Sequence, residues 1–306
     1  MESNIFDTAL IFEGGGMRAS YTAAVVNALL DHELYFDNVY GISAGSSHTV
    51  NYLSRDKKRT RDSFIESVEF PDFGGVGTFL QHKGYFNAKY IYEEACRPGE
   101  RLPFRFDDFM ANPAKATIAG MRRDTGDTVF WTRDDMKTLE STMIRVRASS
   151  TLPLFMTPPR IDGYYYYDGG LGEGGGIIID RAIRDGFDRF LIIRSRPRGY
   201  RKKETRSALS ALYPRRPYLR HAINTRRRRY NAVCDEIDEL ERQGKAYVFY
   251  SRDMTATSAT TDHATLEQNY AAGERQVAEE MPAILEFLGM DGASGEGRAG
   301  ERSLGR

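Results

Sequence analysis

The segment 38–46, with the sequence NVYGISAGS, constrains the fold of this chain more than any other stretch. A short apolar run leads into a Gly-x-Ser-x-Gly spacing, and a stretch with helical periodicity follows it. This order is typical of a strand, a sharp turn and a helix, with Ser43 at the apex of the turn. Gly41 and Gly45 flank the serine where a Cβ would collide with the strand and helix backbones. An ordinary βα turn with an N-cap serine has the same spacing, so this motif alone does not decide the chemistry.

A glycine triplet, Gly14–Gly16, precedes this segment. It follows the apolar run 8–12 and comes before a helical pattern over 19–30. Successive glycines expose backbone N–H groups at a helix N-terminus, which makes a cradle for an anion. The spacing fits neither the dinucleotide motif nor the P-loop. Because adjacent βα turns of a parallel sheet open at the same edge, we expect the cradle to face Ser43 and to act as an oxyanion hole.

An aspartate follows a further strand-like segment. The aromatic run 164–167 ends at Asp168, and Gly169 and Gly170 come directly after it. Such a sequence can form a simple turn. It can also hold a carboxylate where other backbone approaches closely, and Asp168 would then accept the Ser43 proton as a general base.

Together these motifs resemble the patatin-like phospholipase family. The family pattern is a glycine triplet with a basic residue, a Gly-x-Ser-x-Gly motif, a block with serine and proline, and an aspartate before two glycines. The corresponding segments here are Gly14-Gly15-Gly16-Met17-Arg18, Gly41-Ile42-Ser43-Ala44-Gly45, Ala148-Ser149-Ser150-Thr151-Leu152-Pro153 and Asp168-Gly169-Gly170. They occur in the family's order within about residues 8–195.

The resemblance implies both a fold and a site. The fold is α/β, a three-layer α/β/α arrangement with a mostly parallel central sheet. The site is a Ser–Asp dyad without a catalytic histidine, in which Ser43 is the nucleophile and Asp168 the base. The implied oxyanion hole consists of the N–H groups of Gly14, Gly15 and Gly16, with the positive charge of Arg18 nearby. Glu13, Ala19 and Ser46 differ from the residues that are common in the family at these positions. We expect these differences to affect substrate preference more than catalytic activity.

By the same resemblance, the chain is a lipid acyl ester hydrolase of the phospholipase A, lysophospholipase or esterase type. It would work through an acyl-enzyme on Ser43, and we expect neither a cofactor nor a metal. Two alternatives remain open. One is an α/β-hydrolase with a Ser-Asp-His triad that uses His221 or His263 as the base. The other is a non-catalytic module that binds an anionic ligand on the same fold, with Ser43 only a hydrogen-bond donor.

A basic segment follows the predicted hydrolase motifs. Residues 194–229 contain 14 basic side chains and one acidic one, although the whole chain has a formal net charge of zero. With its interleaved aromatic residues, this composition suits contact with an anionic membrane surface. It also suits a partner protein or a solvated helical face, and we do not expect nucleic acid as a partner. The acidic stretch 235–241 is expected to neutralise part of this charge.

The remaining expectations concern domains and compartment. We expect a single hydrolase domain over 1–290, a basic helical insertion or subdomain at 194–245, and a disordered tail at 291–306. The N-terminus lacks the features of a signal peptide, and no apolar run reaches membrane-spanning length. We expect Cys96 and Cys234 to be buried thiols. These features predict a cytoplasmic protein with peripheral contact to a membrane.

Some further elements can be predicted from local pattern. Runs 115–121 and 128–131 around a turn signal predict a β-hairpin. The run 190–193 is apolar throughout, as in a buried parallel strand, and we expect it to close the main sheet. The aromatic and glycine-rich stretch 70–92 is compatible with a lid over an apolar ligand and with an aromatic loop packed on the core.

Overall fold

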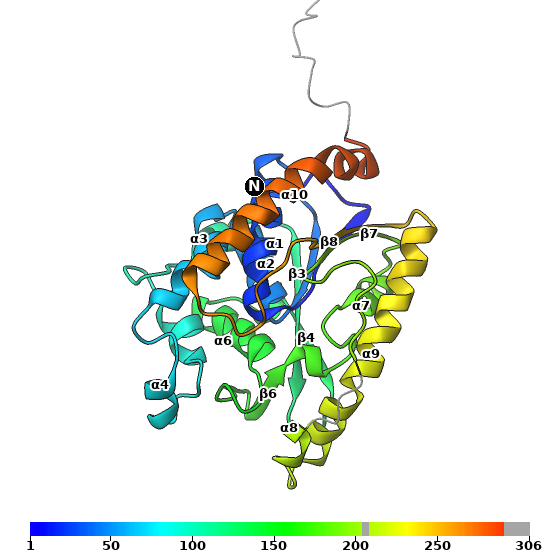
Figure 1. Ribbon diagram of the computed structural model, residues 1–306. Coiled ribbons are helices and arrows are strands. Elements are labelled where there is room, and N and C mark those ends of the chain that lie inside the picture. Colours follow the sequence, from blue (N-terminus) through cyan, green and yellow to red (C-terminus); the bar gives the residue numbers. More distant parts are fainter. Residues whose placement is uncertain (204–207, 291–306) are drawn as a thin grey trace, which may run out of the picture.

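The computed structural model describes residues 1–203 and 208–290 (Figure 1). The expected disordered tail at 291–306 lies outside the described residues. Within the described ranges, none of the helices is both long enough and apolar enough to cross a membrane.

A central sheet organises the molecule. Its parallel part follows the order β3, β2, β1, β7, β8. These strands span Lys115–Arg122, Asn38–Ile42, Thr8–Phe12, Arg189–Arg194 and Ala246–Tyr250. The antiparallel strands β4 (Thr128–Thr132), β5 (Arg160–Ile161) and β6 (Tyr164–Asp168) join the sheet at β3. The predicted hairpin is confirmed by β3 and β4, but the expectation that 190–193 closes the sheet is wrong, because β8 pairs along the outer side of β7.

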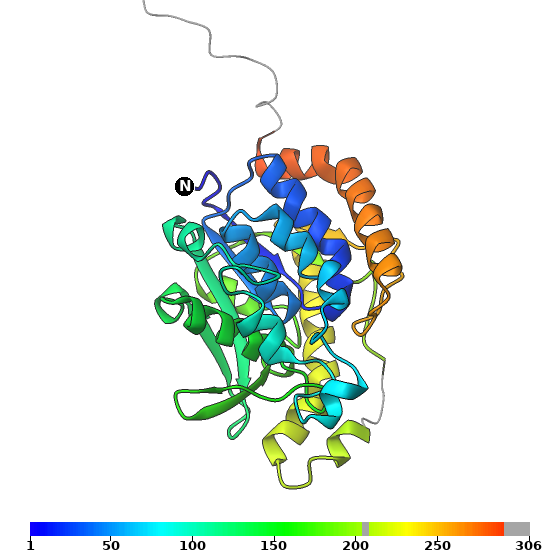
Figure 2. The same cartoon turned by 90° about the vertical axis from the view of Figure 1, so that its left-hand side faces the viewer.

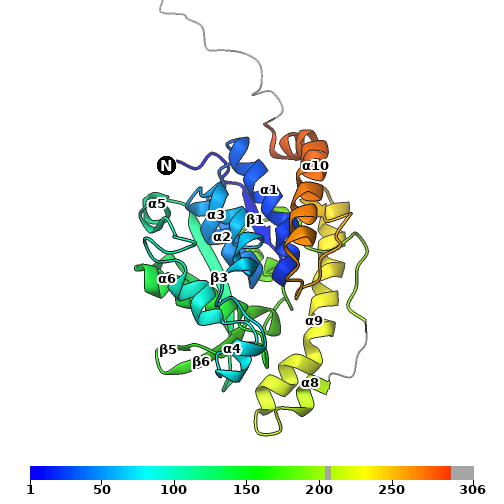
Figure 3. The same cartoon turned by 60° about the vertical axis from the view of Figure 1, so that its left-hand side comes forward.

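Helices cover both faces of this sheet (Figures 2 and 3). One face is covered by α1 (Ala19–Asp31), α2 (Ala44–Leu53), α6 (Leu139–Ser150) and α10 (His263–Leu288). The other face is covered by α7 (Ile179–Arg184) and α9 (Pro217–Arg242). Shorter helices and turns connect these elements: α3 (Lys57–Asp62), η2 (Glu66–Glu69), α4 (Val76–Leu80), η3 (Tyr90–Glu94), α5 (Phe106–Ala111), η4 (Arg133–Asp135) and α8 (Ala208–Ala211).

The side chains of β1 show why both faces need a helical layer. Leu10 and Phe12 pack among residues of α1, α2, α6 and α10, whereas Ala9 and Ile11 pack against α7 and α9. Successive side chains of a strand point to opposite faces, so a continuous apolar run is stable only when both faces are buried. The predicted three-layer α/β/α fold with a mostly parallel sheet is therefore confirmed.

The segment 194–245 contributes to the second helical layer. Residues of α9 such as Tyr230, Val233 and Ile237 join the core beneath the sheet. Part of the basic charge is neutralised within the chain, since Arg198 forms an ion pair with Glu241 and Arg201 forms ion pairs with Asp235 and Asp238. The single domain over 1–290 and the status of 194–245 as an insertion stay predictions.

Candidate active site

Ser43 lies at the turn between β2 and α2, as the strand–turn–helix pattern predicts. Its backbone has φ 57° and ψ −127°, in the left-handed half of the map that non-glycine residues rarely adopt. A Cβ on Gly41 would overlap the carbonyl oxygen of Gly45, and one on Gly45 would overlap that of Phe12. The two glycines therefore permit the close packing of strand and helix that holds Ser43 in this conformation.

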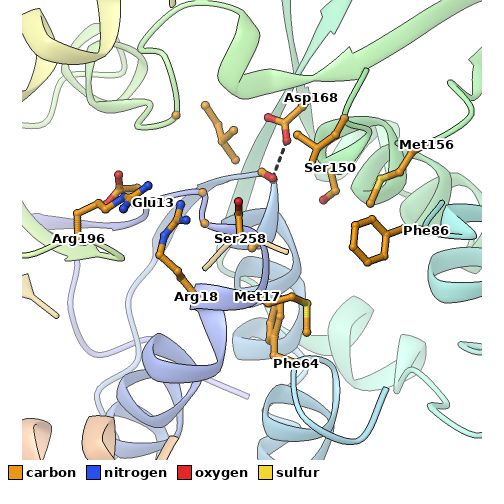
Figure 4. Close-up of a pocket in the computed structure, with 18 of the residues that line it drawn as sticks. Glu13, Met17, Arg18, Phe64, Phe86, Ser150, Met156, Asp168, Arg196 and Ser258 are labelled. Carbon is orange, nitrogen blue, oxygen red and sulfur yellow. Dashed lines mark hydrogen bonds between the residues drawn. The ribbon is translucent and has the colours of Figure 1, made fainter. Parts of the chain in front are cut away.

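The register of β3 brings Ser43 and Asp168 together. Strand β2 pairs with β3 up to Ile42 opposite Ala119, and β6 pairs with the next residue, Gly120 opposite Asp168. Because β4 occupies the other edge of β3 over these residues, β6 continues along the edge where β2 stops. The Ser43 hydroxyl donates a hydrogen bond of 2.7 Å to Oδ2 of Asp168, the dashed line in Figure 4.

The Asp168 carboxylate is buried and held in place by backbone. Its Oδ1 accepts a 2.7 Å hydrogen bond from the N–H of Gly170, in the turn η5 (Gly169–Leu171). A Cβ on Gly169 would overlap the carbonyl oxygen of Ala119, so this position needs glycine. Burial raises the pKa of Asp168, while the charge of Arg226 and the hydrogen bond from Ser43 act in the opposite direction. The net result is a more basic carboxylate than one in water.

The glycine triplet lines the same cavity as Ser43 and Asp168, but only part of it is available as an oxyanion hole. The N–H of Gly14 donates a 3.0 Å hydrogen bond to the carbonyl oxygen of Gly176, so the expectation that it points into the site is wrong. Within the described chain, the N–H groups of Gly15 and Gly16 have no acceptor. The N–H of Ser43 itself donates to the hydroxyl of Ser149.

The Glu13 side chain holds the glycine loop in place through hydrogen bonds to other elements. Its Oε2 accepts hydrogen bonds from Nε of Arg194 at 2.9 Å and from the N–H of Ser195 at 2.8 Å, and its Oε1 accepts one from the Tyr230 hydroxyl at 2.5 Å. The side chains of Glu13 and Arg194 are each 2% exposed. Glu13 stands where the family usually has aspartate. Its hydrogen bonds join the carboxyl ends of β1 and β7 to α9, and so fix the position of the glycine loop.

We expect the Glu13→Gln variant to lose about 3–5 kcal/mol of unfolding free energy at pH 7, because it leaves the buried Arg194 charge uncompensated. Burial raises the pKa of Glu13, but Arg194 and Tyr230 outweigh this and hold the pKa below its usual value of 4.5. The ion pair's contribution is therefore complete above about pH 4.5 and is lost as the pH falls through the lower pKa of the folded state.

Urea unfolding of wild type and variant from pH 7 downward measures this difference. The exposed Glu100→Gln variant is the control and should unfold like wild type. A Glu13→Gln variant as stable as Glu100→Gln at pH 7, or a deficit that grows toward low pH, would contradict the assignment.

The cavity around the dyad has two chemically distinct walls (Figure 4). One wall is apolar and includes Phe64, Phe73, Phe86 and Met156; the other is cationic and consists of Arg18, Arg196, Lys202 and Arg226. In Figure 4, Arg18 and Arg196 lie to the left of Asp168, and Phe86 and Met156 lie to its right. The stretch 70–92 thus supplies part of the apolar wall, and its role as a moving lid stays a prediction.

The structure does not bring a histidine to Ser43. The described residues that line the cavity include none. His221 is exposed on α9, and His263 begins α10, where it lies 3.4 Å from Glu66. His48, beneath the site, is fully buried, and its Nε2 lies 2.9 Å from the Thr22 hydroxyl. Burial lowers the pKa of His48 to about 3, so its ring is neutral.

Potential metal ligands lie elsewhere. Among the described residues, Glu66, His263 and Glu267 are spaced closely enough to hold an ion. Arg61 forms ion pairs with both carboxylates, and none of these residues lines the Ser43 cavity. The group is therefore accounted for as a surface ion-pair cluster.

Comparison with known proteins identifies the family. A family model described as Patatin-like phospholipase matches residues 10–179, more than half of the chain. This chain belongs to the patatin-like phospholipase family. A second model, Domain of unknown function (DUF6363), matches residues 216–289, from α9 to the end of α10.

Individual relatives of this patatin-like chain are distant. The uncharacterized protein YjjU of Escherichia coli (strain K12) is 23% identical over 195 residues, which cover 62% of this chain and 52% of that protein. The chain thus matches about half the length of this curated relative. The crystal structure of VipD from Legionella pneumophila aligns with a TM-score of 0.48 and 11% identity, over 90% of this chain and 67% of that one.

Sequence reasoning missed some residues of this patatin-like cavity. Ser149 belongs to a motif that was recognised, but its contact with the Ser43 N–H was not expected. Arg196, Lys202 and Arg226 belong to the basic segment for which the sequence left a membrane surface, a partner protein and a solvated helical face open, and the structure places them in the lining of the site. A usable signal was available for Arg196 and Lys202, because both closely follow a parallel strand, where side chains reach the carboxyl edge of the sheet.

Proposed function

We propose that this chain is a lipid acyl ester hydrolase that uses a Ser43–Asp168 dyad. The observation that carries the proposal is the 2.7 Å hydrogen bond from the Ser43 hydroxyl to the buried Asp168 carboxylate, inside a cavity with an apolar wall. Membership of the patatin-like phospholipase family supports the same class of reaction. Neither a metal nor an organic cofactor has a part in the proposed reaction.

The reaction follows from the positions of these groups. The Ser43 oxygen attacks the ester carbonyl carbon while its proton passes to Asp168. The resulting oxyanion accepts hydrogen bonds from the N–H groups of Gly15 and Gly16 and lies near the N-terminus of α2. Collapse of the intermediate breaks the ester bond, and the alcohol leaves with the proton from Asp168. Water then attacks the acyl-enzyme with Asp168 again as the base, which releases the carboxylic acid and restores Ser43.

The raised pKa of Asp168 fits this role. A carboxylate in water is a weak base toward a serine hydroxyl, and burial makes the protonated form less unfavourable. The direct contact between the two side chains also removes the need for an imidazole between them.

Covalent labelling by a fluorophosphonate probe tests the proposal, because the probe reacts only with an activated serine. Labelling confined to Ser43, together with turnover of p-nitrophenyl esters, is the expected result. The cationic wall also favours a second candidate, a non-catalytic module that binds an anionic ligand. That candidate predicts neither labelling nor turnover, and ligand binding that survives the Ser43→Ala change.

We also propose that the protein contacts an anionic membrane surface through residues near α8 and the start of α9. Leu212 and Tyr218 are 59% and 53% exposed there, among the exposed Arg215, Arg216 and Arg220. Figure 3 places α8 at the same end of the molecule as α4, whose Val76 and Leu80 are 70% and 72% exposed. Apolar side chains bordered by basic ones suit an anionic lipid surface.

Removing two of these charges, in the double variant Arg215→Gln/Arg220→Gln, should weaken binding to phosphatidylglycerol vesicles by roughly tenfold or more. Vesicle sedimentation measures the change. The control is Lys115→Gln/Lys245→Gln, which removes the same charge at the amino ends of β3 and β8. Equal losses in the two double variants, or equal binding of wild type to phosphatidylglycerol and phosphatidylcholine vesicles, would refute a localised membrane contact.

A further inference from the structure

The cationic wall of the cavity has no carboxylate partner among the residues that the structure describes. In the described chain, no carboxylate oxygen lies within 4 Å of a side-chain nitrogen of Arg18, Arg196, Lys202 or Arg226. Nearby arginines of the same segment behave differently: Arg194, Arg198 and Arg201 each form an ion pair within the chain. Four cationic side chains for which the described residues supply no carboxylate partner thus line the same cavity as Ser43.

Among the described residues that line the cavity, the acidic ones are Glu13 and Asp168, and both already have hydrogen-bond partners. Glu13 is occupied by Arg194, Ser195 and Tyr230. Asp168 is engaged by Ser43 and by the N–H of Gly170. Both carboxylates attract the cations of the wall through space, but neither forms an ion pair with one of them.

Arg18 is buried, and Arg196, Lys202 and Arg226 are partly buried. Arg18 is 8% exposed, and its buried Nε has no hydrogen-bond partner. The Lys202 ammonium lies 4.2 Å from the centre of the Tyr230 ring, and the Arg196 guanidinium lies 4.2 Å from that of Tyr200. Aromatic faces can hold cations in place, but they do not supply the negative charge that a buried cation requires.

The electrostatic state of the wall favours the binding of an anion. Burial lowers the pKa of Lys202 to about 7, and the charges of Arg226, Arg196 and Arg18 act in the same direction, against Glu13. Burial and Arg196 together lower the pKa of Arg18 to about 10. A bound anion would favour the charged form of both side chains.

We propose that this wall binds the phosphate of the substrate's alcohol half, so that the enzyme prefers acyl glycerophosphates with a terminal phosphate over neutral glycerides. The inference rests on the proposed hydrolase function. If the acyl chain lies along the apolar wall, the alcohol half of an ester held at Ser43 points to the cationic side (Figure 4). Guanidinium groups bind phosphate oxygens in a bidentate manner, and the lysine adds a compact charge.

The chemistry of the wall also discriminates among head groups. A terminal phosphate presents up to two negative charges to the cations. A phosphocholine presents one, with a quaternary ammonium beyond it that the same cations would repel. We therefore expect the order acyl glycerol phosphate, then acyl glycerophosphocholine, then acyl glycerol in catalytic efficiency.

Short-chain substrates in monomeric solution test the proposal without a membrane. The measured quantity is the ratio of kcat/KM for 1-hexanoylglycerol 3-phosphate to kcat/KM for 1-hexanoylglycerol. This ratio should exceed about 10 for wild type, and should fall roughly 10- to 100-fold in Arg196→Gln and in Lys202→Gln. Arg196→Lys should restore part of the ratio. Lys245→Gln removes an exposed charge outside the cavity and should keep the wild-type ratio.

Binding to the Ser43→Ala variant separates this inference from the hydrolase proposal. Calorimetry with glycerol 3-phosphate and with inorganic phosphate is the probe, and glycerol 3-phosphate is expected to bind more tightly. If glycerol 3-phosphate binds to Ser43→Ala but wild type hydrolyses no ester, the hydrolase proposal is refuted and the anion site is retained. Turnover with a ratio near one, unchanged in Arg196→Gln and Lys202→Gln, would refute the head-group subsite and keep the hydrolase. Equal binding of both probes with a ratio near one would assign the wall to free phosphate and overturn the head-group proposal.

Discussion

Replacing Ser43 by alanine is expected to reduce ester hydrolysis by roughly 10⁴-fold or more and to abolish labelling by a fluorophosphonate. The variant removes the proposed nucleophile, so no acyl-enzyme can form, and any residual rate comes from binding and the oxyanion hole alone. Turnover of p-nitrophenyl esters of increasing chain length measures the loss, and the wild-type profile reports how the apolar wall accommodates the chain.

Ser54→Ala is the matched control, because Ser54 caps the other end of the same helix and hydrogen-bonds the carbonyl oxygen of Asn51. It should keep both turnover and labelling. Circular dichroism and thermal unfolding confirm that both variants are folded. Turnover that persists in Ser43→Ala would place the nucleophile elsewhere.

Asp168→Asn is expected to lower kcat/KM by roughly 10²–10⁴, the usual contribution of a general base. Asparagine has the same shape, and its carbonyl oxygen can still accept the hydrogen bond from the Gly170 N–H, so the fold should be retained. What is lost is the capacity to take the Ser43 proton. The exposed Asp162→Asn variant, in the turn before β6, should leave the rate unchanged.

The pH dependence of the wild-type rate gives a separate test of Asp168. The base must be ionised, so the rate falls as the pH drops through the pKa of Asp168, which burial raises above its usual value of 3.8. This acidic limb should disappear from the residual activity of Asp168→Asn. Activity that survives in Asp168→Asn but disappears on replacement of His221 or His263 would favour the triad instead.

Local sequence pattern predicted much of the fold because its causes are local. The apolar run of β1 requires burial on both faces, and the spacing of Gly41 and Gly45 follows from backbone contacts within one strand–turn–helix unit. The turn at Ser43 could therefore be recognised from a few neighbouring residues. The hairpin of β3 and β4 could be recognised in the same way.

What could not be predicted depends on contacts between distant segments. The N–H of Gly14 is occupied because the loop that ends at Gly176 packs against it, more than 150 residues further along the chain. The count of basic residues in 194–229 gave the charge of that segment but not the direction of each side chain. The sequence pattern therefore groups Arg196 and Lys202 with Arg215 and Arg220, although the fold places the first two in the cavity wall and the other two on the outer surface.

Strand β6 continues along the edge of β3 where β2 stops. The Ser43–Asp168 pair therefore forms only when this part of the sheet has folded. Ser43 and Asp168 are 125 residues apart, and their alignment depends on the pairing of both β2 and β6 with β3. A slip of one residue in the pairing of β6 would turn the carboxylate to the opposite face of the sheet. A truncated or misfolded chain thus carries a serine without its base. Recovery of hydrolysis during refolding would report when this one edge has formed in register, rather than when the chain has become compact.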